Sequence, residues 1–140
     1  MSSKKQITAP AFDILSFYNT DPSLEESGAV MKLTEDRSGN AYFLVRPFPN
    51  HDYNRKMAEA YQQNVDVFKK GGKEADDIDR EVTASVLADT ILVGCGGMAQ
   101  EYSREFAIQC MKNNHIREKV ITFASSIANY RIKDEEIEKK

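Results

Sequence analysis

Tryptophan is absent from this chain of 140 residues, which also holds only two cysteines and two histidines. So few cysteines cannot form a disulfide framework, and Cys95 and Cys110 are expected to be free thiols in a reducing, intracellular setting. Zinc sites usually present closely spaced ligand pairs. Cys95, Cys110, His51 and His115 form no such pair, so no metal site and no cofactor are expected.

A long apolar run is also missing. The longest lies at about Val86–Val93 and contains Asp89 and Thr90, so it is too short and too polar to span a bilayer. Residues 1–6 are polar and lead into no apolar segment of the kind found in secretory signals. These features predict a protein that remains inside the cell and does not enter membranes.

Charge of one sign is not concentrated anywhere in the globular part of the sequence. The formal net charge is −3, and the lysines and arginines are scattered among the acids. Nucleic-acid and membrane-surface binders concentrate cationic side chains on one face, so neither partner is expected. The apolar share of 41% and the charged share of 29% are those of a folded domain of ordinary size.

The pattern along the chain predicts an α+β fold that is predominantly α: an N-terminal β-hairpin followed by a bundle of about four short helices. Residues 1–27 are expected to form an arm or a short first element, 28–132 one globular domain, and 133–140 a charged tail. The hairpin is placed at residues 29–48, because two runs rich in branched and aromatic residues flank a turn with Asp, Gly and Asn.

Apolar residues at intervals of three and four predict the helices after the hairpin. Glycines within 94–97 are expected to end the second helix, and Asp76 or Asp77 to cap its start. Ser103 is the expected N-cap of the third helix, and the pair Asn113-Asn114 separates it from the fourth. The expected helices span residues 52–70, 78–93, 103–112 and 116–131.

Three patterns that could carry chemistry are weak in this sequence. Cys95 stands among glycines, as some nucleophiles do, but a working thiol needs a nearby base. His115 is the nearest candidate in sequence, and nothing in the sequence shows that it lies near Cys95 in space. The glycines at 94–97 lack the Lys and Ser/Thr that a phosphate-binding loop needs. The acids within 76–81 do not have the spacing of a calcium loop. The sequence therefore favours a protein that is not an enzyme.

The block Leu87–Ala107 resembles the tail assembly chaperones, and related tail accessory proteins, of long-tailed bacteriophages. Such chains carry L-A-D-x-x-L-x-x-W-x-G followed by an apolar residue, then a polar turn and a helix start of the type P-Y-S-x-E-x-A. The matching residues here are Leu87-Ala88-Asp89, Leu92, Gly97-Met98, and Tyr102-Ser103-x-Glu105-x-Ala107. Cys95 stands where the family has Trp, and the turn before Tyr102 is shorter.

The resemblance implies a non-catalytic function in the cytoplasm of a bacterial host. Such chaperones are thought to coat the long helical tape measure protein and keep it soluble until tail tube subunits polymerise around it. Self-association of the chain is a further expectation. The expected partner-binding residues are the apolar ones near the glycine turn and in the last helix: Leu92, Cys95, Met98, Tyr102, Phe106, Phe123 and Ile127.

Two alternatives stay open at this point. The chain could be a structural subunit of the virion, such as a tail or head–tail completion protein, because an arm and a charged tail suit contacts between subunits. It could also be an enzyme built on Cys95. Detection in purified particles would favour the first alternative, and loss of function in Cys95→Ser the second.

Overall fold

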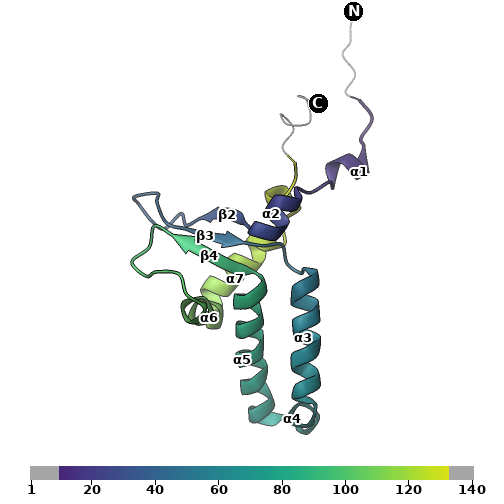
Figure 1. Cartoon of the computed structure of the whole chain (residues 1–140), viewed down its shortest axis with the longest axis vertical. Coiled ribbons are helices and arrows are strands. Elements are labelled where there is room, and N and C mark those ends of the chain that lie inside the picture. Colours follow the sequence, from purple (N-terminus) through teal and green to yellow (C-terminus); the bar gives the residue numbers. More distant parts are fainter. Residues whose placement is uncertain (1–9, 133–140) are drawn as a thin grey trace, which may run out of the picture.

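The computed structural model of the chain describes residues 10–132 and has an α+β fold that is predominantly helical, as the sequence predicts (Figure 1). Its strands form an antiparallel sheet in the order β2-β3-β4. The elements in chain order are α1 (Ile14–Phe17), α2 (Pro22–Ser27), β2 (Ala29–Lys32), β3 (Tyr42–Val45), α3 (His51–Gln63), α4 (Val65–Lys70), α5 (Gly72–Thr90), β4 (Leu92–Gly96), α6 (Arg104–Lys112), α7 (Asn114–Ala124) and the 3-10 helix η1 (Ile127–Asn129).

The predicted hairpin is present, and a carboxylate organises its turn. β2 and β3 pair antiparallel with Met31 opposite Phe43, and the burial along β2 alternates as a sheet with one covered face requires. The Asp36 carboxylate accepts hydrogen bonds from the backbone N–H groups of Asn40 and Ala41 at 3.0 and 2.8 Å. These bonds, the Ala41 bond above all, lower the pKa of Asp36 and hold the turn closed.

A third strand corrects the prediction that a helix runs over 78–93 and ends in a glycine turn. α5 ends at Thr90, and β4 pairs antiparallel with β3. The glycines of β4 lie under side chains of β3: a Cβ at Gly94 would stand 2.9 Å from Leu44 Cδ1, and one at Gly96 2.4 Å from the Tyr42 hydroxyl oxygen. They therefore leave the space that the Leu44 and Tyr42 side chains occupy.

The helix boundaries differ from the prediction in three further places. α5 begins at Gly72, and its N-cap position, Gly71, makes no side-chain capping bond, so the expected cap at residue 76 or 77 is wrong. The helix expected over 52–70 is divided at Asn64 into α3 and α4. The last helix, α7, spans residues 114–124 and is followed by η1.

The predicted cap at Ser103 is confirmed, because its hydroxyl accepts a hydrogen bond from the Phe106 N–H at 3.0 Å. The predicted break at Asn113 is also present. The Asn113 side chain caps α7 by accepting bonds from the N–H groups of His115 and Ile116. Both are local side-chain-to-backbone contacts, which short sequence patterns predict well.

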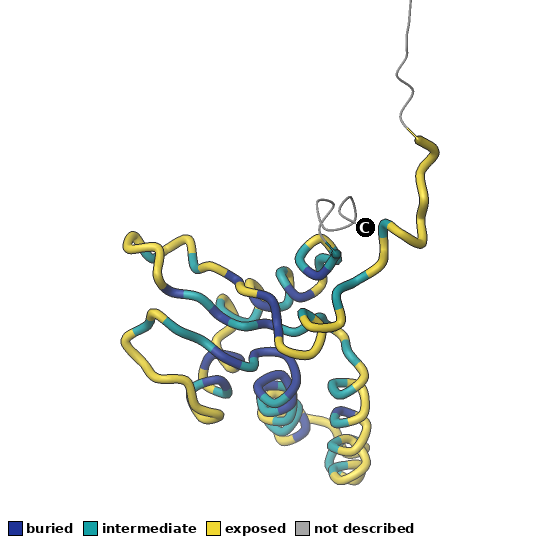
Figure 2. Tube along the Cα trace, turned by 45° about the horizontal axis from the view of Figure 1, so that its top comes forward, coloured by how far each residue is buried: buried dark blue, intermediate teal, exposed yellow. Residues whose placement is uncertain are grey.

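The core lies where one face of the sheet meets α5, α6 and α7, and α3 and α5 continue away from it as a pair of long helices (Figure 1). Figure 2 shows the buried residues gathered at this junction. Within residues 10–132, no helix has both the length and the apolar character that crossing a membrane requires. The buried core residues are Met31, Phe43, Val45, Ala84, Leu87, Ala88, Ile91, Leu92, Ala107, Cys110, Met111, Val120 and Ala124.

The segment before the sheet contains the short helices α1 and α2, and α1 projects from the body (Figure 1). Hydrogen bonds tie the segment to the end of the domain: the Asp21 N–H donates to the Tyr130 carbonyl at 2.7 Å, and Thr20 forms an isolated β-bridge with Arg131. The expected charged tail at 133–140 and the first nine residues of the expected arm lie outside the described residues.

Candidate functional site

An apolar cavity of about 480 Å³ lies at the hairpin end of the core. One wall is the covered face of the sheet, and the others come from the loop after β4, from α6 and from α7. Its lining is mostly apolar, as is usual for binding sites. The apolar lining residues are Met31, Leu33, Phe43, Met98, Phe106, Cys110 and Ile116, and the polar ones are Glu35, Asp36, Gln100 and Lys119.

A second cavity of about 480 Å³ adjoins the first and extends along α7 to His115 and Phe123. Met31, Leu33, Glu35 and Lys119 line both cavities. The two cavities together are called the groove below. It runs between the hairpin and α7, and it is lined by side chains on three separate segments of the chain.

An ion pair stands at the boundary between the two cavities. Glu35, in the hairpin turn, pairs with the ammonium of Lys119 on α7. The hydrogen bond from Lys119 is the main cause of the lowered pKa of Glu35. Both side chains are more than half exposed, so water screens the pair and it contributes little to stability. Its position instead divides the groove, because the pair joins the hairpin to α7 between the two cavities.

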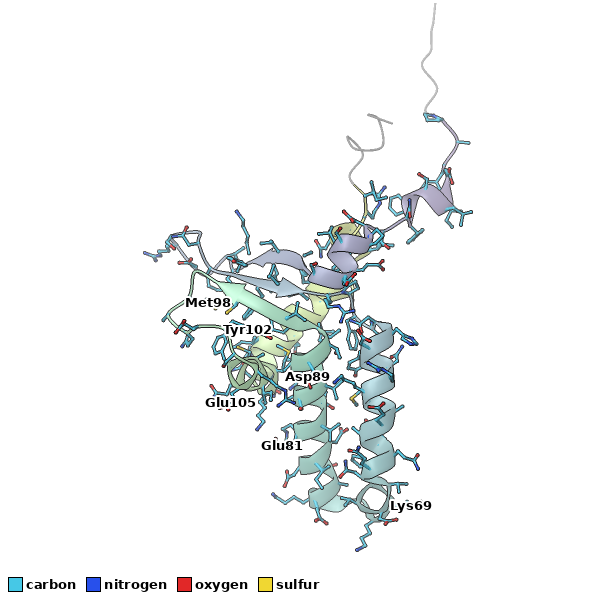
Figure 3. The ribbon with its side chains drawn as sticks, viewed as in Figure 1. Lys69, Glu81, Asp89, Met98, Tyr102 and Glu105 are labelled. Atoms are coloured by element: carbon cyan, nitrogen blue, oxygen red, sulfur yellow. The ribbon has the colours of Figure 1, made fainter. Side chains whose placement is uncertain are left out.

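The structure brings together only part of the predicted partner-binding set. Met98 and Phe106 line the first cavity, and Phe123 lines the second. Tyr102 is 41% exposed and lies with Met98 on the loop between β4 and α6 (Figure 3). Its hydroxyl is directed at the Leu92 carbonyl, 3.4 Å away.

The other three predicted residues lie elsewhere. Leu92 is only 1% exposed and belongs to the core, so it cannot be reached by a partner. Cys95 is half-buried against the core from β4. Ile127 is half-buried in η1, outside the lining of the groove.

Sequence reasoning missed the contribution of the hairpin and of the Glu35–Lys119 ion pair. Met31 and Phe43 face the groove because their strands pair in register, and the alternation in β2 was the only local signal for this face. Glu35 and Lys119 are 84 residues apart in the sequence. Nothing in the sequence pattern indicated that they would meet.

The two thiols lie in surroundings that disfavour the thiolate. Burial raises the pKa of Cys110 to about 11 and also raises the pKa of Cys95. His115 is exposed and lines the second cavity, whereas Cys110 lines the first. Across the described residues 10–132, no cluster of three or more His, Cys, Asp or Glu side chains is arranged to hold a metal ion. The arrangement suits the binding of apolar surface.

The block that resembles phage tail chaperones has a structural role in this fold. Leu87 and Ala88 are buried, and Asp89 accepts two hydrogen bonds from Arg104, the closer one at 2.7 Å. Figure 3 shows Asp89 on α5, facing the start of α6. This bidentate pair joins α5 to α6 and so supports the wall of the groove.

These features define a small α+β protein with an open groove between its sheet and helices, which is apolar in the first cavity and has a larger share of polar side chains along α7. Comparison of the chain with protein-family models, with curated proteins and with solved structures finds no match. The features that bear on its function are the groove and the Leu87–Ala107 block.

Proposed function

We propose that the chain is a non-catalytic tail assembly chaperone of a long-tailed bacteriophage. In this role it binds the tape measure protein in the host cytoplasm and keeps it soluble during tail assembly. The observation that carries the proposal is the open apolar groove between the hairpin and α7. The resemblance of the Leu87–Ala107 block to such chaperones adds the identity of the partner.

The groove has the properties needed to cover one stripe of an amphipathic helix. Binding of this type places a few apolar side chains of the helix, three or four residues apart, into apolar pockets. Two methionines, Met31 and Met98, line the first cavity. Methionine is flexible and polarisable, so such a surface adapts to different side chains. A chaperone that coats a long helical protein must accept many similar stripes.

Covering these stripes prevents aggregation, because large exposed apolar patches associate with one another. Glu35 and Lys119 are both more than half exposed, so these two charged groups would keep contact with water when a helix is bound. In this proposal, tail tube subunits replace the chaperone as they polymerise around the tape measure protein.

The test is co-expression of the chain with the tape measure protein of the same phage, followed by pull-down and measurement of the soluble fraction. Met98→Glu places a charge in the first cavity and is expected to abolish recovery of the tape measure protein. Val30→Glu is the matched control, because Val30 is 53% exposed on the opposite face of the sheet. Equal recovery with both variants would count against binding through the groove.

A second candidate function is that of a structural subunit of the virion, favoured by the exposed apolar side chains of the segment before the sheet. Phe12 and Leu15 are 70% and 82% exposed, as contact residues of a subunit are before assembly. Mass spectrometry of purified virions separates the two functions. Absence from virions supports the chaperone, and presence at a fixed copy number supports the subunit.

A further inference from the structure

The most exposed apolar residues of the described chain gather in one short segment. Eight large hydrophobic side chains within residues 10–132 are exposed, and four of them lie between residues 12 and 18. This segment, residues 10–18, is called the arm below. A cluster of this kind on a projecting element usually marks an interaction site. The four side chains and their exposed fractions are Phe12 70%, Ile14 58%, Leu15 82% and Tyr18 53%.

The base of the arm is attached to the body through Phe17 and the residues that follow it. Arg131 donates from Nε to the Phe17 carbonyl at 2.6 Å, and its guanidinium lies 4.0 Å from the centre of the Phe17 ring. The Ile132 N–H also donates to the Asn19 carbonyl at 3.2 Å. Phe17 therefore holds the arm to the body, and the apolar side chains on either side of it are exposed to solvent.

The arm and the first cavity lie toward opposite ends of the sheet. Figures 1 and 2 both show the arm beyond the end of the sheet that is remote from the hairpin turn, and Figure 3 shows Met98 at the turn end. With its base tied to Arg131, the arm extends away from the hairpin end of its own chain, where the first cavity lies (Figures 1 and 2). A second copy can present its first cavity to the arm.

We propose that the arm of one copy docks into the groove of a second copy. The arm supplies two aromatic and two aliphatic side chains, and the groove presents Met31, Phe43, Met98 and Phe106. Asp13 is the one acidic or basic residue of the arm, whereas the lining of the groove carries both Lys32 and Lys119 and the acids Glu35, Asp36 and Glu118. The match between arm and groove is therefore one of apolar surface.

The area is sufficient if two copies exchange arms reciprocally. A buried aromatic side chain contributes about 150–250 Å², so two docked arms and the two groove surfaces that they cover bury on the order of 1,000 Å² or more. Reciprocal exchange of one element between identical chains is a common route to a dimer. The docked arm also keeps the groove covered when no partner is present. This last point rests on the proposed function, because it makes the arm a placeholder that the tape measure protein displaces.

The test is sedimentation equilibrium of the full chain without any partner. The unchanged chain is expected to dimerise. The arm variant Phe12→Ser/Leu15→Ser and the groove variant Met98→Glu are each expected to raise the dimer dissociation constant about tenfold or more. The control Val30→Ser/Val65→Ser removes two exposed apolar side chains elsewhere and should leave the constant unchanged. Circular dichroism verifies that each variant is folded. A monomer at about 100 µM, or equal constants for all variants, would overturn the proposal.

Disulfide trapping distinguishes arm-in-groove docking from packing of arm against arm. A chain with Leu15→Cys is mixed with a chain carrying Gln100→Cys, since Gln100 is an exposed residue at the mouth of the first cavity. A mixed disulfide between the two chains is expected. Disulfides confined to pairs of Leu15→Cys chains would overturn the proposal.

Addition of the tape measure protein separates this inference from the proposed function. If the dimer forms and the tape measure protein dissociates it, both hold. If the dimer forms and the tape measure protein neither binds nor dissociates it, arm docking stands and the chaperone function fails. If the tape measure protein binds a chain that never dimerises, the chaperone function stands and arm docking fails.

Discussion

Gly97 and Gly39 have the same left-handed backbone conformation, with φ of +67° and +76°, but very different surroundings. A Cβ at Gly97 would lie 2.1 Å from the Asn40 carbonyl oxygen, whereas one at Gly39 would meet nothing within 4 Å. The end of β4 therefore approaches the backbone of the hairpin turn as closely as a glycine allows. This contact sets the position of the loop that carries Met98.

The first prediction concerns this pair of glycines. Gly39→Ala incurs only the left-handed penalty, about 1–2 kcal/mol of unfolding free energy. Gly97→Ala incurs the same penalty and must also displace backbone, so it is expected to destabilise by a further ~1–3 kcal/mol. Urea denaturation of the two variants measures the difference. Equal losses would show that the hairpin turn and β4 do not meet in this way.

The second prediction concerns the thiols. Because burial raises the pKa of Cys110 to about 11 and raises that of Cys95 as well, both are expected to react slowly with iodoacetamide at pH 7–8. The rate should rise as the pH approaches 11 and should rise at once in urea, which exposes both groups. Cys95→Ser assigns the remaining signal to Cys110. Rapid alkylation of Cys95 in the folded chain at pH 7 would revive the hypothesis of a nucleophile.

At the scale of the element, Asn50 joins the start of α3 to the end of α5. Its side-chain oxygen accepts the Tyr53 N–H at 2.8 Å, which caps α3. Its side-chain nitrogen donates to the Thr90 carbonyl at 3.0 Å and to the Pro47 carbonyl at 3.1 Å. One amide thus serves a helix start and a helix end that are 40 residues apart.

The third prediction separates these two roles of Asn50. Asn50→Ala loses the cap and both donated bonds, and it is expected to cost about 2 kcal/mol of unfolding free energy. Asn50→Asp keeps the cap but turns a carboxylate oxygen toward two carbonyl oxygens. It should therefore be no more stable than Asn50→Ala, although Asp is normally as good a cap as Asn. Asn50→Ser, measured in the same thermal unfolding series, restores the cap alone and should lie between the unchanged chain and Asn50→Ala. Wild-type stability of Asn50→Asp would show that only the cap matters.

At the scale of the whole molecule, Tyr130 holds the end of the domain against the sheet. Its side chain is 2% exposed, and its hydroxyl donates to the Val45 carbonyl at 2.8 Å. The Tyr130 carbonyl accepts a hydrogen bond from the Asp21 N–H. The next residue, Arg131, donates a hydrogen bond to the Phe17 carbonyl at the base of the arm. The sheet, the arm and the last turn of the chain are therefore connected through this one region.

The fourth prediction uses the titration of Tyr130. Burial raises its pKa above the ordinary value of 10.0, so the neutral phenol is favoured in the folded state. Its stabilising contribution is complete below pH 10 and is lost as the pH rises toward the folded-state pKa. Tyr130→Phe should cost about 1–3 kcal/mol at pH 8, because the Val45 carbonyl loses its donor. It should also lose less stability than the unchanged chain between pH 8 and pH 11. If Tyr130→Phe and the unchanged chain lost the same unfolding free energy between pH 8 and pH 11, the result would contradict the burial of this hydroxyl.

Several parts of this protein follow from local sequence alone. The hairpin at Ala29–Val45, the cap at Ser103 and the helix break at Asn113 were all predicted, because each depends on contacts within a few residues. The predominantly helical α+β class follows from the same periodicities. The block Leu87–Ala107 suggested a phage tail chaperone, and that function stays a prediction.

Tertiary structure decided the rest. The local pattern predicts a helix end and a turn at Leu92–Gly96, because glycine is common at helix ends. Glycine also occurs in strands where neighbouring atoms come close, and the local pattern does not distinguish the two cases. Only the pairing of β4 with β3, about 50 residues earlier in the chain, makes this segment a strand and buries Leu92. The groove has the same origin: the hairpin, the loop after β4, α6 and α7 each supply part of its wall. No local pattern encodes that meeting, because the free energy that drives it comes from apolar burial between distant segments.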